Sequence, residues 1–104
     1  MTICALSSAS GSSGVAVIRI SGPETKNLIK KLIKKELPRP RMASLLELYN
    51  INTSSLIDEA IVLWFPGPNS YTGEDMAELH VHGSRAVIKS VQNTILDTQK
   101  CRLA

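Results

Sequence analysis

The sequence predicts an α+β fold in which two amphipathic helices pack against one mixed β-sheet. Two patterns predict it: short β-branched runs bounded by turn residues, and two stretches with apolar residues at helical spacing. The length of 104 residues allows one modest core. An apolar content of 43% and a charged content of 20% are typical of a globular protein rather than a disordered one.

The N-terminal half is expected to contain two strands and the first helix. Residues 2–8 alternate loosely and predict a short strand, and the small-residue loop Ser8–Gly14 follows. This loop lacks a Lys-Ser/Thr ending and opens a strand, so we exclude a nucleotide-binding P-loop. The run "VAVIRISG", which ends at Gly22, predicts a strand buried on both faces.

The helix that follows is expected to begin with Pro23 at its first position and Glu24 in its first turn. "PRPR" ends it, because proline cannot continue a helix. Its apolar stripe comprises Leu28, Ile29, Leu32, Ile33 and Leu37.

The C-terminal half is expected to supply a hairpin, another strand and the second helix. Strands at residues 42–51 and 56–65 flank the turn "NTSS", and the loop Pro66–Gly73 leads to a strand at residues 75–82. The second helix is expected near Ser84–Thr98. A further strand is expected to begin in "KCRLA", so we expect the chain to be a fragment of a longer protein.

Charge, hydropathy and cysteine usage narrow the class of protein. Seven of the twelve Lys and Arg lie between Lys26 and Arg41, which favours a solvated helix face, with phosphate or RNA binding as the alternative. The longest apolar runs are too short to cross a bilayer, and no signal peptide is visible. Cys4 and Cys101 lack a CxxC spacing, which predicts reduced thiols in a cytoplasmic protein.

Two charged residues inside expected strands are the first candidates for a site. Arg19 lies in a central strand, where burying an unpaired guanidinium costs on the order of several kcal/mol, and Glu78 is its obvious partner. Two interpretations stay open. The pair either satisfies only itself or supplies two contacts to a polar ligand.

Glu78, His80 and His82 stand two apart, so a strand places all three on one face. They could ligate zinc or another divalent metal, but strand residues two apart lie about 6.6 Å from one another, which strains chelation of one ion. Hydrogen-bonding imidazoles are the favoured interpretation, and we assign no metal ligand. No Ser-His-Asp set or activated cysteine is recognisable, so we assign no catalytic residue.

The stretch "FPGPNSYTGED" is expected to form a preorganised wall, since two prolines and two glycines fix its path. Tyr71 within it could stack on a flat heterocycle. A carboxylate such as Glu78 could receive the paired N–H donors of a pterin or purine edge.

The stretches "GVAVIRISGP" and "LWFPGPNSYTGEDMAELHVHG", together with "IDEAIVLWF" and "RLA", resemble the N-terminal domain of the tRNA-modifying GTPases of the MnmE/TrmE family. The resemblance covers essentially the whole chain. It implies a GcvT-like α+β module, similar to the folate-binding domain of the glycine-cleavage T-protein, that binds a reduced folate and mediates homodimerisation. It also places Arg19 at the family's folate-contacting arginine and Glu78 at the glutamate that receives the pterin's paired donors.

The resemblance implies partners as well. The whole family enzyme takes a one-carbon unit from 5-formyl- or methylene-tetrahydrofolate and acts with an MnmG/GidA-type flavoprotein on the wobble uridine of certain tRNAs. GTP, Mg and K belong to the full-length protein only.

Three departures from the family pattern limit what is carried over. The glycine-rich start is the milder "SASGSSG", the family's continuation past "RLA" with another folate-binding lysine is missing, and so are its helical domain, GTPase domain and C-terminal cysteine motif. We therefore expect residues 1–104 to be incomplete at the C-terminal end and not catalytic alone. The alternatives are a dimerisation scaffold with an incomplete folate site, or the metal site at Glu78, His80 and His82.

Overall fold

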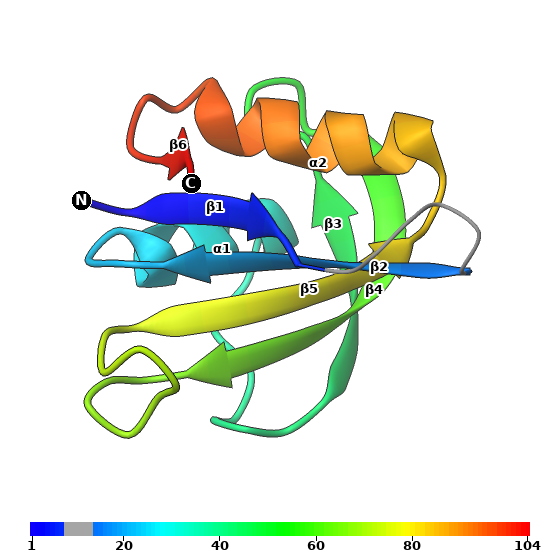
Figure 1. Cartoon of the computed structure of the whole chain (residues 1–104). Helices are drawn as coiled ribbons and strands as arrows, with labels where there is room; N and C mark the ends of the chain where they lie inside the picture. Colours follow the sequence, from blue (N-terminus) through cyan, green and yellow to red (C-terminus); the bar gives the residue numbers. More distant parts are fainter. Residues whose placement is uncertain (8–13) are drawn as a thin grey trace.

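The computed structural model describes residues 1–7 and 14–104, which form one six-stranded sheet and two helices (Figure 1). The predicted α+β class is confirmed, as is the strand expected at the chain's end. The elements are β1 (Ile3–Leu6), β2 (Val15–Ser21), α1 (Thr25–Ile33), β3 (Ser44–Tyr49), β4 (Leu56–Phe65), β5 (Met76–His82), α2 (Arg85–Leu96) and β6 (Arg102–Leu103).

The sheet has the strand order β3-β4-β5-β2-β1-β6, so β2 and β5 are neighbours in its middle. The β1–β6 pair is parallel and the other pairs are antiparallel, which makes the sheet mixed as predicted. The β2–β5 register sets Arg19 directly opposite Glu78. Two residues 59 positions apart in the sequence therefore meet at the centre of the sheet.

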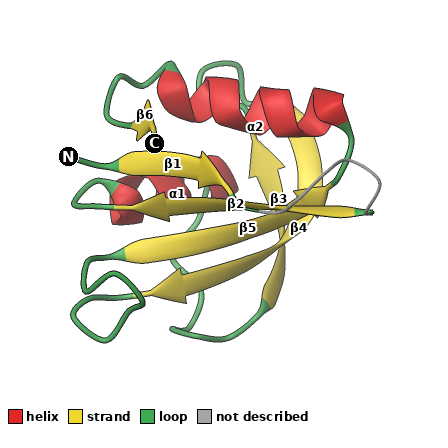
Figure 2. Ribbon diagram, in the orientation of Figure 1, coloured by secondary structure: helices red, strands yellow, loops and turns green. Residues whose placement is uncertain are grey.

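Both helices cover the same face of the sheet. The buried apolar residues of α1 and α2 belong to the same core cluster as Ala16, Ile18 and Ile20 of β2. Figure 2 distinguishes the two helices from the strands that they cover. The alternate residues of β2, such as Val17 and Arg19, are only partly buried. The prediction that β2 is buried on both faces is wrong, because no helix of the described residues covers the second face.

The bounds of α1 differ from the prediction at both ends. The helix begins at Thr25, and Glu24 is its N-cap, with a backbone N–H that donates to Thr2 Oγ1 at 2.8 Å. It ends at Ile33 because Lys34 takes the left-handed conformation, with φ of 58°. Leu37 therefore lies outside the helix, although it still packs against the core.

The second half of the chain follows the sequence pattern closely. β4 has the expected bounds, and it pairs with β3 in the predicted hairpin. α2 lies inside the expected range, and the Ser84 side chain caps it by accepting a hydrogen bond from the Val87 N–H at 3.2 Å. The predicted loop Ser8–Gly14 lies outside the described residues except for Gly14.

The two cysteines are buried free thiols where β1 and β6 meet. Burial, together with the neighbouring Cys101 thiol, raises the pKa of Cys4 to about 12. Burial also raises the pKa of Cys101. Such thiols stay protonated near neutral pH and are poor nucleophiles. Neither helix of the described residues is long and apolar enough to cross a membrane.

Candidate functional site

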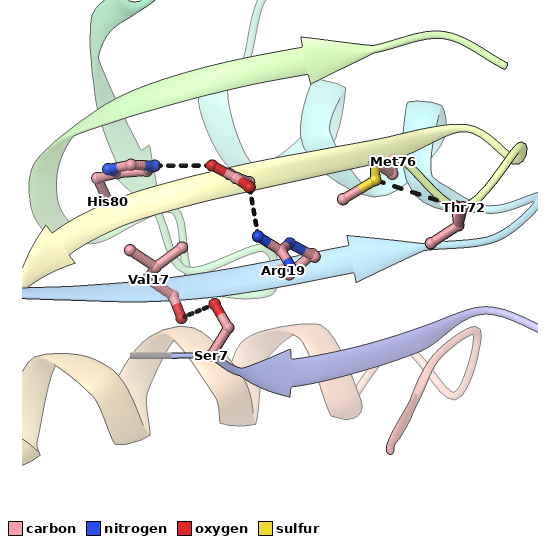
Figure 3. Close-up of polar contacts among 7 residues, drawn as sticks. Ser7, Val17, Arg19, Thr72, Met76 and His80 are labelled. Atoms are coloured by element: carbon pink, nitrogen blue, oxygen red, sulfur yellow. Dashed lines mark hydrogen bonds and ion pairs between the residues drawn. The ribbon is translucent and has the colours of Figure 1, made fainter. Parts of the chain in front are cut away.

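The predicted Arg19–Glu78 pair forms on the open face of the sheet (Figure 3). Arg19 Nη2 donates to Glu78 Oε2 at 2.7 Å. The side chains are 36% and 17% exposed, so the pair is partly covered but reachable from solvent. This geometry differs from a fully buried ion pair and leaves both groups accessible to a ligand.

His80 engages the other oxygen of the same carboxylate. Its Nε2 lies 3.0 Å from Glu78 Oε1, and Figure 3 shows His80 and Arg19 linked through that carboxylate. Burial by itself would raise the pKa of Glu78, but the hydrogen bonds from His80 and Arg19 outweigh it and hold that pKa below its ordinary value. Glu78 is therefore ionised at neutral pH, and its oxygens act only as acceptors.

Arg19 retains a donor that no residue described by the structure satisfies. Its Nε is buried and has no hydrogen-bond partner, the one such side-chain nitrogen or oxygen atom among residues 1–7 and 14–104. Leaving a buried donor unpaired costs about 1–3 kcal/mol. Groups left in this state within native proteins mark strain or a missing partner. The Arg19–Glu78 pair thus does not fully satisfy itself.

Tyr71 stands over the guanidinium of Arg19, with the Arg19 Cζ 5.8 Å from the centroid of the ring. The residue is 88% exposed, so most of the ring is free to contact another molecule. The loop that carries Tyr71 is tied down, as the sequence predicts. The Gly67 N–H donates to Asp75 Oδ1 at 2.9 Å, and Ser70 Oγ donates to the Glu74 carbonyl.

Gly67 is required by close packing within this loop. A Cβ at this position would lie 2.9 Å from the Glu74 carbonyl carbon and 2.9 Å from the Gly73 oxygen. Both are backbone atoms and cannot move aside cheaply. The wall beside the Arg19–Glu78 pair therefore has a fixed path.

Sequence reasoning missed two hydroxyls that connect this loop to β2. Ser21 Oγ and Thr72 Oγ1 share a hydrogen bond of 2.8 Å, and Ser21 Oγ also donates to Glu74 Oε1 at 3.4 Å. Their types are common at strand ends and in loops, so the sequence holds no signal for this contact. It follows only from the pairing of β2 with β5.

His82 shares the face of Glu78 and His80, as predicted, because the three lie opposite Arg19, Val17 and Val15 in the register. His82 does not take part in the hydrogen bonds between His80, Glu78 and Arg19. Its Nδ1 lies 2.7 Å from Asp58 Oδ1, and its backbone N–H donates to Asp58 Oδ2 at 2.9 Å. Asp58 on β4 is only 8% exposed at its side chain and was missed from the sequence.

The metal alternative therefore gains no support from the geometry. The two imidazoles pair with different carboxylates: His80 with Glu78, and His82 with Asp58. In the part of the chain that the structure describes, no three His, Cys, Asp or Glu side chains gather as a metal site would require.

Comparison with known proteins defines the class to which this fold and site belong. The model of the family described as "GTP-binding protein TrmE N-terminus" matches residues 2–104. The chain is 57% identical over 104 residues to the tRNA modification GTPase MnmE of Pelagibacter ubique, covering 100% of this chain and 24% of that relative. It is 48% identical over 96 residues to MnmE of Granulibacter bethesdensis, covering 92% of this chain and 21% of the relative.

A mitochondrial tRNA modification GTPase of Dictyostelium discoideum is 48% identical over 100 residues, which cover 90% of this chain and 20% of that protein. The chain thus spans a quarter or less of the length of these curated relatives. It belongs to the family of TrmE N-terminal segments, as its sequence motifs predict.

Proposed function

We propose that this chain binds a reduced folate, 5-formyl- or methylene-tetrahydrofolate, on the open face of its sheet through Arg19 and Glu78. The observation that supports the proposal most directly is an ionised carboxylate held between two donors on a solvent-reachable face. The Arg19 Nε beside it, which has no hydrogen-bond partner among residues 1–7 and 14–104, further supports a partner that comes from outside these residues.

The acceptor capacity of Glu78 fits the paired N–H donors of a pterin edge. An ionised carboxylate offers about four lone-pair sites. Arg19 and His80 each use one, on different oxygens, which leaves one site on each oxygen for two parallel donors. Tyr71 supplies an exposed aromatic ring next to the same pair, suited to contact a flat heterocycle.

A bound folate would supply a one-carbon unit, and we propose that tRNA modification uses it. Their names state that they are tRNA modification GTPases. We therefore propose that the chain serves wobble-uridine modification of tRNA within a longer protein, together with an MnmG/GidA-type flavoprotein. GTP hydrolysis belongs to the remainder of such a protein, and no catalytic residue is assigned in this chain.

Homodimerisation is the second part of the proposal, and the open sheet face supports it. Ile3, Val15 and Leu45 belong to the strands of this sheet, and these residues are 36%, 51% and 60% exposed. A second copy that covers such apolar surface would remove it from water. Sedimentation velocity of the chain and of Leu45→Lys tests this. We expect a dimer that the lysine weakens, and a monomer at all concentrations would contradict dimerisation.

Isothermal titration calorimetry with 5-formyltetrahydrofolate tests the folate proposal. We expect saturable binding with one ligand per chain and much weaker binding of p-aminobenzoylglutamate, which carries the folate tail without the pterin. Equal affinity for the two ligands would show that the Glu78 carboxylate does not bind the paired N–H donors of a pterin. If the chain bound neither ligand, it would instead be a dimerisation scaffold without a folate site.

A further inference from the structure

His80 is a polar neighbour of Glu78 to which neither the motif nor the family resemblance assigns a role. It lies on β5 two residues after Glu78, on the same face of the sheet. Its cross-strand neighbours on this face are Val17 on β2 and Ile61 on β4, and both are apolar. Glu59 and His82 line the same small hollow as His80. The Nε2–Oε1 distance of 3.0 Å shows that the ring turns to Glu78.

The direction of this hydrogen bond follows from the chemistry of the two groups. An ionised carboxylate has no proton to give, so His80 Nε2 must carry the hydrogen and donate it. His80 is thereby fixed either as the Nε2–H tautomer or as the imidazolium. Its 30% exposed side chain places this donor at the edge of the covered region, next to a carboxylate that is 17% exposed.

Two donors, one on each oxygen, hold the carboxylate plane in place. Arg19 reaches Oε2 from β2, and His80 reaches Oε1 from along β5. With Arg19 alone, the carboxylate could rotate about the bond that carries it, since one hydrogen bond fixes one oxygen only. With both, each oxygen keeps one lone-pair site turned away from its bound donor.

We propose that His80 is a positioning residue of the ligand site: its Nε2–H fixes Oε1 of Glu78, so that the carboxylate presents its two remaining lone pairs to the paired N–H donors of a bound heterocycle. This inference rests on the proposed folate function for the identity of the ligand. It adds a residue that acts through Glu78 and not by contact with the ligand.

The charged surroundings of Glu78 are simple enough to make the effect of His80 measurable. Arg19 lies opposite Glu78 on β2, and the apolar Leu63 lies opposite it on β4. His80 follows two residues later on β5. Removal of the imidazole leaves burial opposed by Arg19 alone, so the carboxyl should titrate at higher pH. A ligand that needs the ionised form should then lose affinity on the acid side first.

The test compares His80→Ala, His80→Gln and His82→Ala in the 104-residue chain. His80→Gln keeps an N–H donor of similar reach, and His82→Ala is the matched control because it removes the neighbouring imidazole, which pairs with Asp58. Two quantities are measured: the titration midpoint of the Glu78 carboxyl carbon by NMR without ligand, and the dissociation constant for 5-formyltetrahydrofolate between pH 5 and 8.

For His80→Ala, we expect the titration midpoint of Glu78 to rise and the affinity to fall about tenfold. His80→Gln should restore the affinity to within about twofold, and His82→Ala should change neither quantity. An unchanged midpoint in His80→Ala, or unchanged affinity there, would overturn the inference. Wild-type chain that binds no folate would instead refute the proposed function and the ligand half of this inference, while the midpoint still decides whether His80 holds the carboxylate.

Discussion

Replacing Glu78 by glutamine separates the role of its charge from that of its shape. The amide keeps the size of the side chain but offers a single acceptor oxygen, and its NH₂ faces a donor from Arg19 or His80. A bound pterin would lose a charge-assisted hydrogen bond and meet a second donor. Such bonds contribute about 1.5–3 kcal/mol each, so we expect the affinity for 5-formyltetrahydrofolate to fall about a hundredfold or more.

The effect of Glu78→Gln on folding should be much smaller. The Arg19 side chain is 36% exposed, and solvent screens a pair of this kind to about 1 kcal/mol or less. The assay is calorimetric titration with the folate, beside urea denaturation of the same samples. Glu59→Gln is the matched control, because it removes an exposed carboxylate from the adjacent strand. Unchanged folate affinity, or a loss of stability above about 3 kcal/mol with no binding in the wild type, would refute the assignment of Glu78 as a ligand contact.

Three further predictions concern the fold around the site. Because the folded pKa of Glu78 is lowered from 4.5, its contribution to stability is full above that value and lost as pH falls through the lower folded value. Acid denaturation of Glu78→Gln should lack this component, and identical acid profiles would contradict the shift. Asp58→Ala leaves the His82 N–H and ring without their acceptor and should cost about 1–3 kcal/mol in urea denaturation, with folate affinity unchanged. A large loss of affinity there would mean that Asp58 also serves the ligand. Gly22→Ala should cost about 2–4 kcal/mol, because φ is +137° and a Cβ would lie 2.5 Å from Thr2 Cα. A wild-type melting temperature would contradict that steric conflict.

The sequence patterns predicted the fold wherever local signals and tertiary packing agree. The β4 bounds and the β3–β4 hairpin follow from a β-branched run and a turn cluster. The N-terminus of α2 follows from the serine at its cap. The sequence pattern did not predict the C-terminal end of α1. The apolar spacing continues to Leu37, whereas Lys34 takes the left-handed conformation and ends the helix.

The burial of β2 also escaped prediction, for a tertiary reason. A continuous run of β-branched residues is typical of strands covered on both faces. Here it belongs to a sheet whose helices lie on one side, so Val17 is only partly buried and Arg19 can meet solvent. The layer that a residue faces depends on where distant helices dock, and no local pattern records that.

For the site, residue types indicated the Arg19–Glu78 pair, but strand pairing decides the rest. A two-residue spacing correctly placed His80 and His82 on one face. It could not show that His80 turns to Glu78 while His82 turns to Asp58 on another strand. The difference arises because Asp58, near the start of β4, contacts both the backbone N–H and the ring of His82, the last residue of β5.

The most direct test of the account is an NMR titration of the 104-residue chain with 5-formyltetrahydrofolate. We expect chemical-shift changes concentrated at Arg19, the Pro66–Gly73 loop, Glu78 and His80, which adjoin one another on the open face. Saturable shifts on that face would support a folate site made by these residues. A well-dispersed spectrum that does not respond, or shifts confined to the helical side of the sheet, would contradict it.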